Sequence, residues 1–482
     1  MDLDTHNNVH PDQIKTTAEQ RWVMRRNPTE FAKGKQTVEE LFWQDIQTFA
    51  PKIIQKVDKS GSPTQAEMAR ALENHTFHGD ESPVAAAIYG VFADIQKSNG
   101  ANFGEPRLTR NDIDVMVQQS LDVEKKYKIL RDLNTWSKTP EAANCFAKLG
   151  GEVRLNNLDR AMQQPNFSPI DRAKLSEIKA NFNSITDQGA IKISDISSRF
   201  AQLKTTPQYD VMDTFQGIMG RVEANQNNPK MHKLYADDNF LNSIKPDAVV
   251  QRNSADCSFK ASLAGYAAMR PEELSKRISS NNGTFTIELP GVGQNKFKVQ
   301  PPTDEELGLY SGRDTSDGFW PLLFAKAYGQ YEYDKVANPF NKARLDKLTI
   351  DEMAGESKTP GVAISALTCH DVDTYKIKDL SDSELTQKIQ SAMAEKRIVV
   401  LGTPGNGEHN TVDGYGSGHA LTLLSAKDNS GKFEITIRDP HGEGAGNPGV
   451  DNPNGVSHAD IAKLRRNFAT IFLETGKSAF SK

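Results

Sequence analysis

The chain has 482 residues, of which 25% are charged and 37% hydrophobic, and it carries a formal net charge of −5 at pH 7. This balance is typical of a globular protein, and the slight negative charge provides no basic surface for nucleic acid or anionic membranes. No apolar run reaches the roughly 18 residues of a membrane span. A chain of this length predicts at least two domains.

The cysteines and the first residues bear on the cellular compartment. Cys145, Cys257 and Cys369 are odd in number and widely spaced, which favours reduced thiols over a disulfide framework. The opening stretch, MDLDTHNNVHPDQ, is polar and acidic and does not resemble a secretory signal peptide. We therefore expect a cytoplasmic protein, with a specialised secretion route left open.

The first half of the sequence predicts helices. Residues 1–38 are expected to form a flexible N-terminal segment, followed by a helical domain over 39–241. Apolar residues between 41 and 57 recur at helical spacing, and Pro51 is expected to separate two helices. Further helix starts are expected from Thr109 to Asp112 and at Ser194, before Asp195.

An internal repeat runs through this helical half. Three segments are echoed about 85 to 90 residues later, which indicates two copies of one helical module. The pairs are GSPTQAEMARALEN (61–74) with GGEVRLNNLDRAMQQ (150–164), AIYGVFADIQKSNG (87–100) with EIKANFNSITDQG (177–189), and RLTRNDIDVMVQQ (107–119) with KISDISSRFAQ (192–202).

The repeat resembles paired EF-hands, which are calcium-binding helix–loop–helix units. Its best loop, VDKSGSPTQAEMARAL, has Asp58, Ser60 and Ser62 at positions one, three and five. Position six is Pro63 instead of glycine, and position twelve is Ala69 instead of the bidentate glutamate. We interpret the module as EF-hand-like with degenerate loops, so calcium binding there is disfavoured.

Beyond about residue 245, short β-type runs alternate with helical stretches, which predicts an α+β domain over 242–482. FTIELPGVGQNKFKVQ (285–300) predicts a β-hairpin around a glycine-containing turn. The other predicted strands are 397–403, 419–426, 433–439 and 467–474, and the predicted helices are 257–269, 272–279, 318–331 and 384–396.

Four residues of this second half form a candidate catalytic set. Cys257 follows a polar segment and opens an apolar helix, where backbone N–H groups and the helix dipole favour a thiolate. His419 lies where a glycine-rich loop meets a strand, and Asp439 ends the next strand. Antiparallel pairing of these strands would bring Asp439 beside His419 and fix its tautomer. Gln251, six residues before Cys257, can offer its amide to an oxyanion beside the Cys257 backbone N–H.

Each of these residues alone has a plainer explanation, as a buried filler, a partly buried imidazole or an ordinary turn. Their joint order favours catalysis, and the adjacent Cys369 and His370 lack the spacing of metal ligands. His409 is a rival base, but it lies within a glycine-rich polar loop. Cys145 and Cys369 are interpreted as structural thiols and Trp320 as a core residue.

Residues 245–475 resemble the calpain-type, papain-like cysteine proteases, with the blocks of that family in their expected order. The matching blocks are QRNSADCSFKASLAG around the nucleophile, GFWPLLFAKAYGQY (W-x-x-L-L-E-K-A-Y), ALTCHDVDTYKI (L-T-G-G), SGHALTLL (G-H-A-Y-S-V), IRDPHGEG (R-N-P-W-G) and the closing HADIAKLRRNFATIFLE. The resemblance implies Cys257 as nucleophile and His419 as general base and acid. It further implies Asp439 as the orienting residue and Gln251 as part of the oxyanion hole.

Three positions depart from the family pattern. Asp439 stands where asparagine is usual and would hold His419 more strongly as a cation. His441 replaces the tryptophan that shields this pair from water. Ser258 follows the nucleophile where a tryptophan is usual, which loosens the wall of the cleft.

The sequence therefore predicts a calpain-like cysteine endopeptidase, a hydrolase that cleaves protein or peptide substrates through a thioester on Cys257. Two alternatives stay open: an isopeptidase or acyltransferase with the same residues, and an inactive protease-like adaptor, which the departures at Ser258 and His441 favour. The chemistry requires no cofactor. The resemblance implies calcium dependence through the protease core, and the helical repeats are expected to regulate activity or dock substrates. We expect no nucleic-acid partner and no membrane span, and the sequence carries no signal for an oligomeric state.

Overall fold

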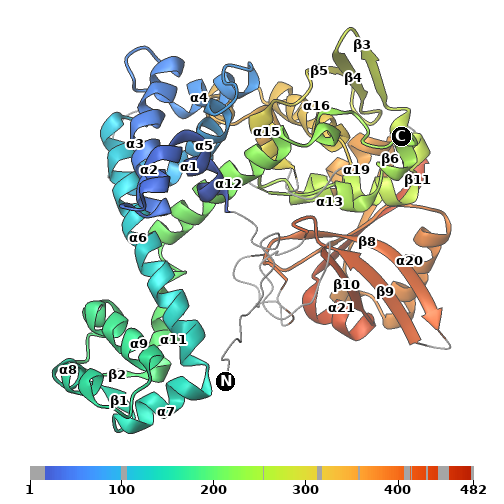
Figure 1. Ribbon diagram of the computed structural model, residues 1–482. Coiled ribbons are helices and arrows are strands. Elements are labelled where there is room, and N and C mark those ends of the chain that lie inside the picture. Colours follow the sequence, from blue (N-terminus) through green and yellow to red (C-terminus); the bar gives the residue numbers. More distant parts are fainter. Residues whose placement is uncertain are drawn as a thin grey trace. The chain divides into compact units, whose positions relative to one another are not determined.

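The computed structural model describes residues 17–98, 106–252, 254–311, 317–356, 359–405, 413, 415–429, 432–442 and 455–478. Helices and antiparallel sheets both occur within them, in agreement with a mixed α and β class. The chain divides into two compact units (Figure 1). The first comprises the described parts of Met1–Pro63 and Ala87–Gly220, and the second those of Thr64–Ala86 and Arg221–Lys482. The domains predicted at 39–241 and 242–482 stay a prediction.

The first unit is made almost entirely of helices. In chain order its elements are α1 (Ala18–Arg26), α2 (Pro28–Lys33), α3 (Val38–Val57), α6 (Arg110–Ser137), α7 (Pro140–Lys148), β1 (Glu152–Val153), α8 (Leu155–Gln163), α9 (Pro169–Ala180), α10 (Phe182–Ile185), β2 (Ile191–Lys192) and α11 (Ile193–Leu203). Two further helices, α5 (Glu81–Ser98) and α12 (Pro207–Gln226), include residues of both units. In the described part of the chain, no helix combines the length and apolar character that crossing a bilayer requires.

Two predictions for the start of the chain are wrong. The segment expected to be flexible up to residue 38 contains α1 and α2, and Trp22 is fully buried against Phe42, with ring centroids 6.5 Å apart. The Trp22 indole also donates to Asp45 at 2.6 Å, which fixes α1 on α3. Helix α3 runs through Pro51 without a break, because the apolar stripe on both sides of the proline packs into one core.

The second copy of the predicted repeat forms a small helical lobe of its own. Strands β1 and β2 pair antiparallel between helices α7 to α11, and a continuous apolar core includes Phe146 and Ile191. The predicted helix start at Thr109 and Asp112 is confirmed as a reciprocal cap. Helix α11 begins one residue earlier than expected, because the Asp195 carboxylate accepts from the Lys192 backbone N–H at 2.8 Å.

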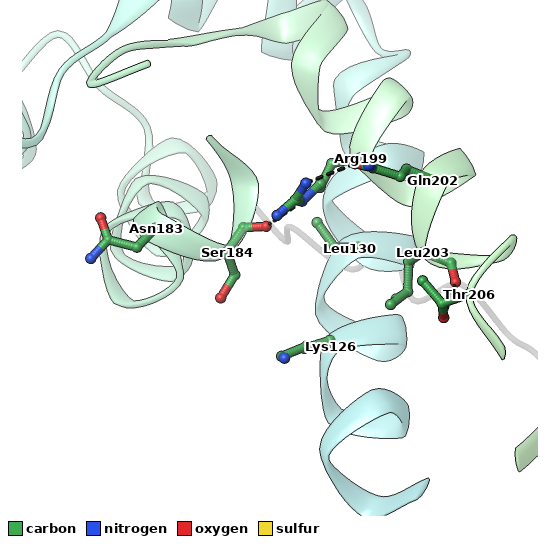
Figure 2. Close-up of a pocket in the computed structure, with 8 residues that line it drawn as sticks. All are labelled: Lys126, Leu130, Asn183, Ser184, Arg199, Gln202, Leu203 and Thr206. Carbon is green, nitrogen blue, oxygen red and sulfur yellow. Dashed lines mark hydrogen bonds between the residues drawn. The ribbon is translucent and has the colours of Figure 1, made fainter. Parts of the chain in front are cut away.

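A pocket of about 330 Å³ lies beside α6, between α10 and α11 (Figure 2). Its two cationic lining residues are Lys126 and Arg199. Arg199 donates to the Ser184 carbonyl at 2.9 Å and to Gln202 at 2.7 Å, so its guanidinium already serves to link helices.

The second unit combines helices with two antiparallel sheets. Its helices are α4 (Gln65–Glu73), α13 (Cys257–Met269), α14 (Pro271–Ser275), α15 (Asp304–Tyr310), α16 (Trp320–Asp334), α17 (Pro339–Leu345), α18 (Ile350–Met353), α19 (Pro360–Thr368), α20 (Asp382–Ala394) and α21 (Ile461–Asn467). The 3-10 turns are η2 (Pro229–His232), η3 (Phe240–Asn242), η4 (Pro246–Ala248) and η5 (Ile377–Asp379). The strands are β3 (Ile278–Asn281), β4 (Thr284–Glu288), β5 (Lys296–Val299), β6 (His370–Lys376), β7 (Val399–Gly402), β8 (Ala420–Asn429), β9 (Lys432–Arg438), β10 (Val456–Ala459) and β11 (Thr470–Ser478).

The six-stranded sheet has the order β10-β9-β8-β7-β11-β6. Successive side chains of a strand point to opposite faces. Leu421 and Leu423 of β8 therefore face one side, where they share a core with α20 and α21. Thr422 faces the other side and donates to the Ala261 carbonyl of α13 at 2.6 Å. Helix α13 approaches closely at Gly265, where an added Cβ would lie 2.8 Å from Ile398.

The predicted hairpin at 285–300 is confirmed. Strands β4 and β5 pair antiparallel with Ile287 opposite Phe297, and β3 completes a three-stranded sheet. The four other predicted strands correspond to β7, β8, β9 and β11.

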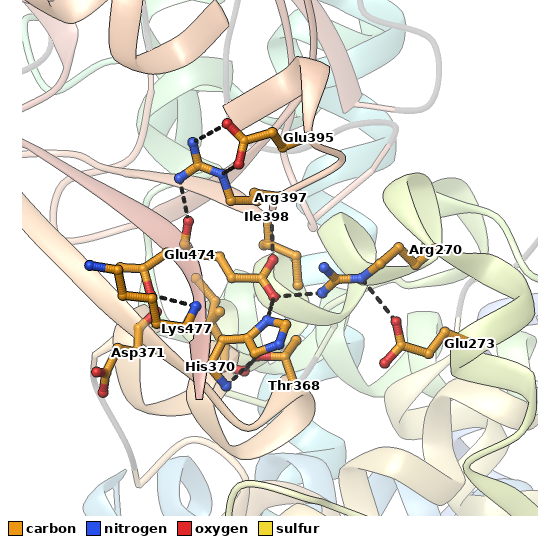
Figure 3. Close-up of polar contacts among 12 residues, drawn as sticks. Arg270, Glu273, Thr368, His370, Asp371, Glu395, Arg397, Ile398, Glu474 and Lys477 are labelled. Carbon is orange, nitrogen blue, oxygen red and sulfur yellow. Dashed lines mark hydrogen bonds and ion pairs between the residues drawn. The ribbon is translucent and has the colours of Figure 1, made fainter. Parts of the chain in front are cut away.

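A buried carboxylate joins α13 to the edge of the large sheet (Figure 3). Glu474 of β11 accepts hydrogen bonds from Arg270 at 2.6 Å, from His370 at 2.5 Å and from the Ile398 backbone N–H at 2.8 Å. It is completely buried, so each of these partners compensates for the loss of its hydration.

We expect Glu474→Gln to lower the free energy of unfolding by about 3 kcal/mol, because it removes the buried charge that Arg270 and His370 bind and leaves Arg270 only its ion pair with Glu273 at 3.2 Å. Glu395→Gln is the matched control, since this side chain is 60% exposed and its ion pair with Arg397 is 3.2 Å long. The control should change stability by no more than about 0.5 kcal/mol. Urea unfolding of both variants at pH 7 measures the difference, and equal small losses would contradict the anchoring role of Glu474.

Candidate active site

Cys257 is the first residue of α13, as the sequence predicts. Residues 258–267 of this helix are all buried, so its packing fixes the position of the thiol. The preceding Asp256 does not cap the helix through its side chain. Its carboxylate instead accepts from Ser254 at 2.6 Å and lies 3.6 Å from the Lys260 ammonium, with Asp256 and Lys260 almost completely buried.

His419 is held at the entrance to β8 by Thr403. The Thr403 hydroxyl accepts from the His419 backbone N–H at 2.8 Å, and the Thr403 backbone N–H donates to the His419 carbonyl at 2.9 Å. Gly418 precedes it with φ of +63°, a left-handed conformation that favours glycine. These constraints fix the backbone from which the imidazole projects.

Asp439 lies immediately after β9, and strand pairing places it beside His419. The register sets Thr422 of β8 opposite Arg438 of β9. The His419 Nε2 atom lies 2.8 Å from Asp439 Oδ1, and both side chains are nearly buried. Because Nε2 is engaged by the carboxylate, Nδ1 is the nitrogen left for the Cys257 thiol, which lies within hydrogen-bonding reach.

His441 forms a second imidazole layer over His419. The two rings are stacked, with centroids 4.4 Å apart and an interplanar angle of 27°. The His441 backbone N–H donates to Asp439 Oδ1 at 2.9 Å, and its Nδ1 lies 3.1 Å from the same oxygen. His441 thus covers the His419–Asp439 bond. Its own side chain remains 40% exposed.

Gln251 lies close to the other site residues but is partly engaged. Its backbone N–H donates to the Pro440 carbonyl at 2.7 Å, which brings the segment before α13 next to the Asp439 loop. Its side-chain Nε2 donates to the Ser254 carbonyl at 2.7 Å. A primary amide nitrogen carries two hydrogens, and this bond uses one of them.

Electrostatic coupling shifts all three titratable groups toward their charged forms. Burial alone would raise the pKa of the Cys257 thiol, but the hydrogen bond and charge of His419 outweigh it and hold this pKa below its ordinary value. Burial likewise opposes charging of His419, whereas bonds to Asp439 and Cys257 raise the pKa of the imidazole to about 9. The pKa of Asp439 is held well below its usual range despite burial, because His419 and His441 bond to the carboxylate. The arrangement favours a thiolate–imidazolium pair near neutral pH.

The other cysteines differ from Cys257. Cys145 is completely buried in the core of the helical lobe, and desolvation raises its pKa to about 12, so it is a structural thiol. Cys369 ends α19 in a left-handed conformation with φ of +63°. Trp320 is confirmed as a core residue, fully buried with its indole donating to the Ser243 carbonyl at 2.9 Å. The rival base His409 lies outside the described residues.

The loop after α3 does not fit a calcium ion. Its Glu67 carboxylate caps α4 by accepting from the Thr64 backbone N–H at 2.7 Å. Its Asp58 carboxylate accepts from the Ser60 backbone N–H at 3.1 Å and lies 3.6 Å from the Arg107 guanidinium. This cation already neutralises the carboxylate, and Ala69 offers no side-chain oxygen at the last ligand position. Calcium dependence stays a prediction from the family resemblance.

Two contributions to the site were not predicted from the sequence, and a third, the position of His441 beside the His419–Asp439 pair, was implied only by the family resemblance. Thr403 is a polar residue at the end of a β-run, with no sequence signal linking it to His419. The buried pair of Asp256 and Lys260 has helical i, i+4 spacing, which is the signal that could have identified it. The contact of His441 with His419 depends on two segments that meet only through strand pairing.

Comparison with known proteins does not identify a function for this chain, so a functional assignment depends on the geometry of the site. No family model matches the chain, and no significant match to a curated protein was found.

We expect iodoacetamide to alkylate Cys257 at pH 7 at least about tenfold faster than Cys145 or Cys369, because its thiolate is favoured by His419. In His419→Ala, the reaction should slow at pH 7 and rise with pH as an ordinary thiol does, since the cation that lowers the pKa is gone. Peptide mapping of the modified protein across pH 5 to 10 measures each site separately. Equal rates at all three cysteines would contradict the ion pair.

Proposed function

We propose that this protein is a cysteine endopeptidase that cleaves protein substrates through a thioester on Cys257. The observation that carries the proposal is the chain of contacts from the thiol at the start of α13, through His419, to the buried Asp439 carboxylate. A nucleophile, a base and an orienting acid in hydrogen-bonding sequence form the arrangement that nucleophilic acyl transfer requires.

A calpain-type, papain-like fold for the second unit is part of the proposal. Its support is the placement of the nucleophile on a helix that packs against an antiparallel sheet, with His419 at the start of one strand and Asp439 at the end of its neighbour. The order of the sequence blocks gives independent support.

The acylation step follows from the protonation states of the pair. The Cys257 thiolate attacks the scissile carbonyl carbon, and the carbonyl π electrons move to oxygen to form a tetrahedral oxyanion. The Cys257 backbone N–H and the second N–H of Gln251 are the proposed donors to this oxyanion. As the C–N bond breaks, the imidazolium of His419 gives its Nδ1 proton to the leaving amine, and an acyl thioester remains on Cys257.

Deacylation uses the same groups in reverse roles. Neutral His419 takes a proton from water, and the hydroxide formed adds to the thioester carbonyl. Collapse of the second tetrahedral intermediate expels the Cys257 thiolate and releases the carboxylic acid product. Asp439 stabilises the imidazolium formed in this step and keeps Nδ1 directed at the reacting atoms. No calcium ion takes part in either step.

We expect Cys257→Ala to lower kcat/KM for an unfolded protein substrate at least about a thousandfold, because the acyl-enzyme cannot form. Casein turnover by wild type and variant, each with calcium and with chelator, is the measurement, and Cys369→Ala is the control that should keep activity. Unchanged cleavage in Cys257→Ala would contradict the proposed function. Activity that needs Cys257 but not calcium would retain the proposal and remove the calcium dependence.

The identity of residue 439 allows a graded test of its role. Asp439→Asn should retain activity to within about tenfold, because the amide oxygen can still accept from His419 Nε2. Asp439→Ala should lose at least about a hundredfold, because the imidazole is then neither oriented nor charge-stabilised. Steady-state kinetics of the two variants measure this difference, and equal losses would show that the carboxylate charge itself is required.

A further inference from the structure

Three potential metal ligands meet at the edge of the candidate active site. His419 Nε2 lies 2.8 Å from Asp439 Oδ1, and His441 Nδ1 lies 3.1 Å from each of these atoms. Among the described residues, these side chains form the one group of His, Cys, Asp and Glu that is compact enough to share an ion. Ligand atoms of tetrahedral zinc stand about 3.3 Å apart, so only small shifts separate this triangle from a zinc face.

The acyl-transfer mechanism does not account for this convergence. His419 and Asp439 suffice to orient the base, yet the His441 backbone N–H and both imidazoles gather around one carboxylate oxygen. The His441 backbone N–H donates to Asp439 Oδ1, and the two ring nitrogens lie within hydrogen-bonding distance of the same oxygen and of each other, with donor and acceptor roles that their tautomers set. A cation that accepts the nitrogen lone pairs and the carboxylate charge would satisfy all three side chains together.

The three side chains, His419, Asp439 and His441, differ in exposure, so an ion could reach them from the side of His441. The His419 and Asp439 side chains are 7% and 5% exposed, whereas His441 is 40% exposed. The stacked rings require His441 to turn its Nδ1 lone pair toward the ion, and its open side leaves room for that rotation. Two histidines, one carboxylate and a water molecule form a ligand set that zinc uses in proteins.

We propose that His419, Asp439 and His441 bind a divalent first-row transition ion, zinc in the first instance, and that the bound ion switches off the base. Coordination takes the Nε2 lone pair of His419 and releases the Nε2 proton to solvent. The proton on Nδ1 stays in place, and metal-bound neutral imidazole is a weaker acid than imidazolium. It therefore fails to protonate the leaving amine. The ion binding stands by itself, and only its effect on catalysis rests on the proposed function.

The test compares zinc binding by the full chain in four forms: wild type, His441→Phe, Cys257→Ala and His458→Ala. His441→Phe keeps a ring over His419 but removes a ligand, and we expect its Kd for Zn²⁺ to rise at least tenfold in isothermal titration. His458→Ala should stay within about twofold of wild type, since His458 is an exposed histidine near Glu434. Cys257→Ala should retain binding, since the thiol contacts His419 but is not among the proposed ligands. Co²⁺ should give the visible absorption of a low-coordinate nitrogen and oxygen site when it is added to wild type. The same absorption should be absent when Co²⁺ is added to His441→Phe.

Unchanged affinity in His441→Phe, or loss of binding in Cys257→Ala, would overturn the assigned ligand set. The catalytic effect is measured separately, by casein cleavage with Zn²⁺ and after chelation. Reversible inhibition of wild type with resistance in His441→Phe supports the switch, and equal inhibition of both forms overturns it. If no form cleaves casein, the proposed function fails while the binding measurements still decide whether the metal site exists.

Discussion

Antiparallel pairing of β8 with β9 is the constraint on which the candidate site depends. His419 stands just before one strand and Asp439 just after the other, so pairing puts both at the same end of the sheet. A register shift between Leu423 and Ser425 adjusts this pairing by one residue. Because a one-residue slip exchanges the two faces of a strand, the bulge changes which side chains face each side beyond Leu423. The pairing of Thr422 with Arg438, between the bulge and the site, places His419 beside Asp439.

The second requirement is that buried charges compensate one another. His419 and Asp439 lose most of their hydration, and each ionised form is favoured because the other is present, with further support from Cys257 for His419 and from His441 for Asp439. Asp256 and Lys260 repeat this arrangement beneath the nucleophile, and Glu474 does so at the far end of α13. The helix that carries the thiol is consequently tied to its surroundings by polar contacts at both ends. Such ties limit the motion of a thiol that lies within hydrogen-bonding reach of His419.

The departures from the protease pattern have structural consequences of different kinds. Ser258 is buried in α13, and its backbone carbonyl accepts from the Ser262 hydroxyl at 2.7 Å. His441 occupies the position of a shielding tryptophan and still covers His419, but it covers it with a polar, ligand-capable ring. Histidine in place of tryptophan at this position gives less cover against water. It also supplies the third ligand atom of the metal site that is proposed to inhibit the base. Gln251, by contrast, has one N–H committed to the Ser254 carbonyl.

The sequence by itself determined the local features: helix α13 with Cys257 at its start, the hairpin at 285–300, and the strands that flank His419 and Asp439. These follow from hydrophobic periodicity, turn residues and helix-start signals, which act between near neighbours in the chain. The sequence did not predict the helices at 18–33 or the unbroken helix across Pro51, because burial of Trp22 and of an apolar stripe outweighs local polarity and the missing proline N–H. The hold of Thr403 on the histidine, and the contact of His441 with it, were decided only by the tertiary structure. Both depend on strand pairing between residues far apart in the chain, and no local propensity specifies that pairing.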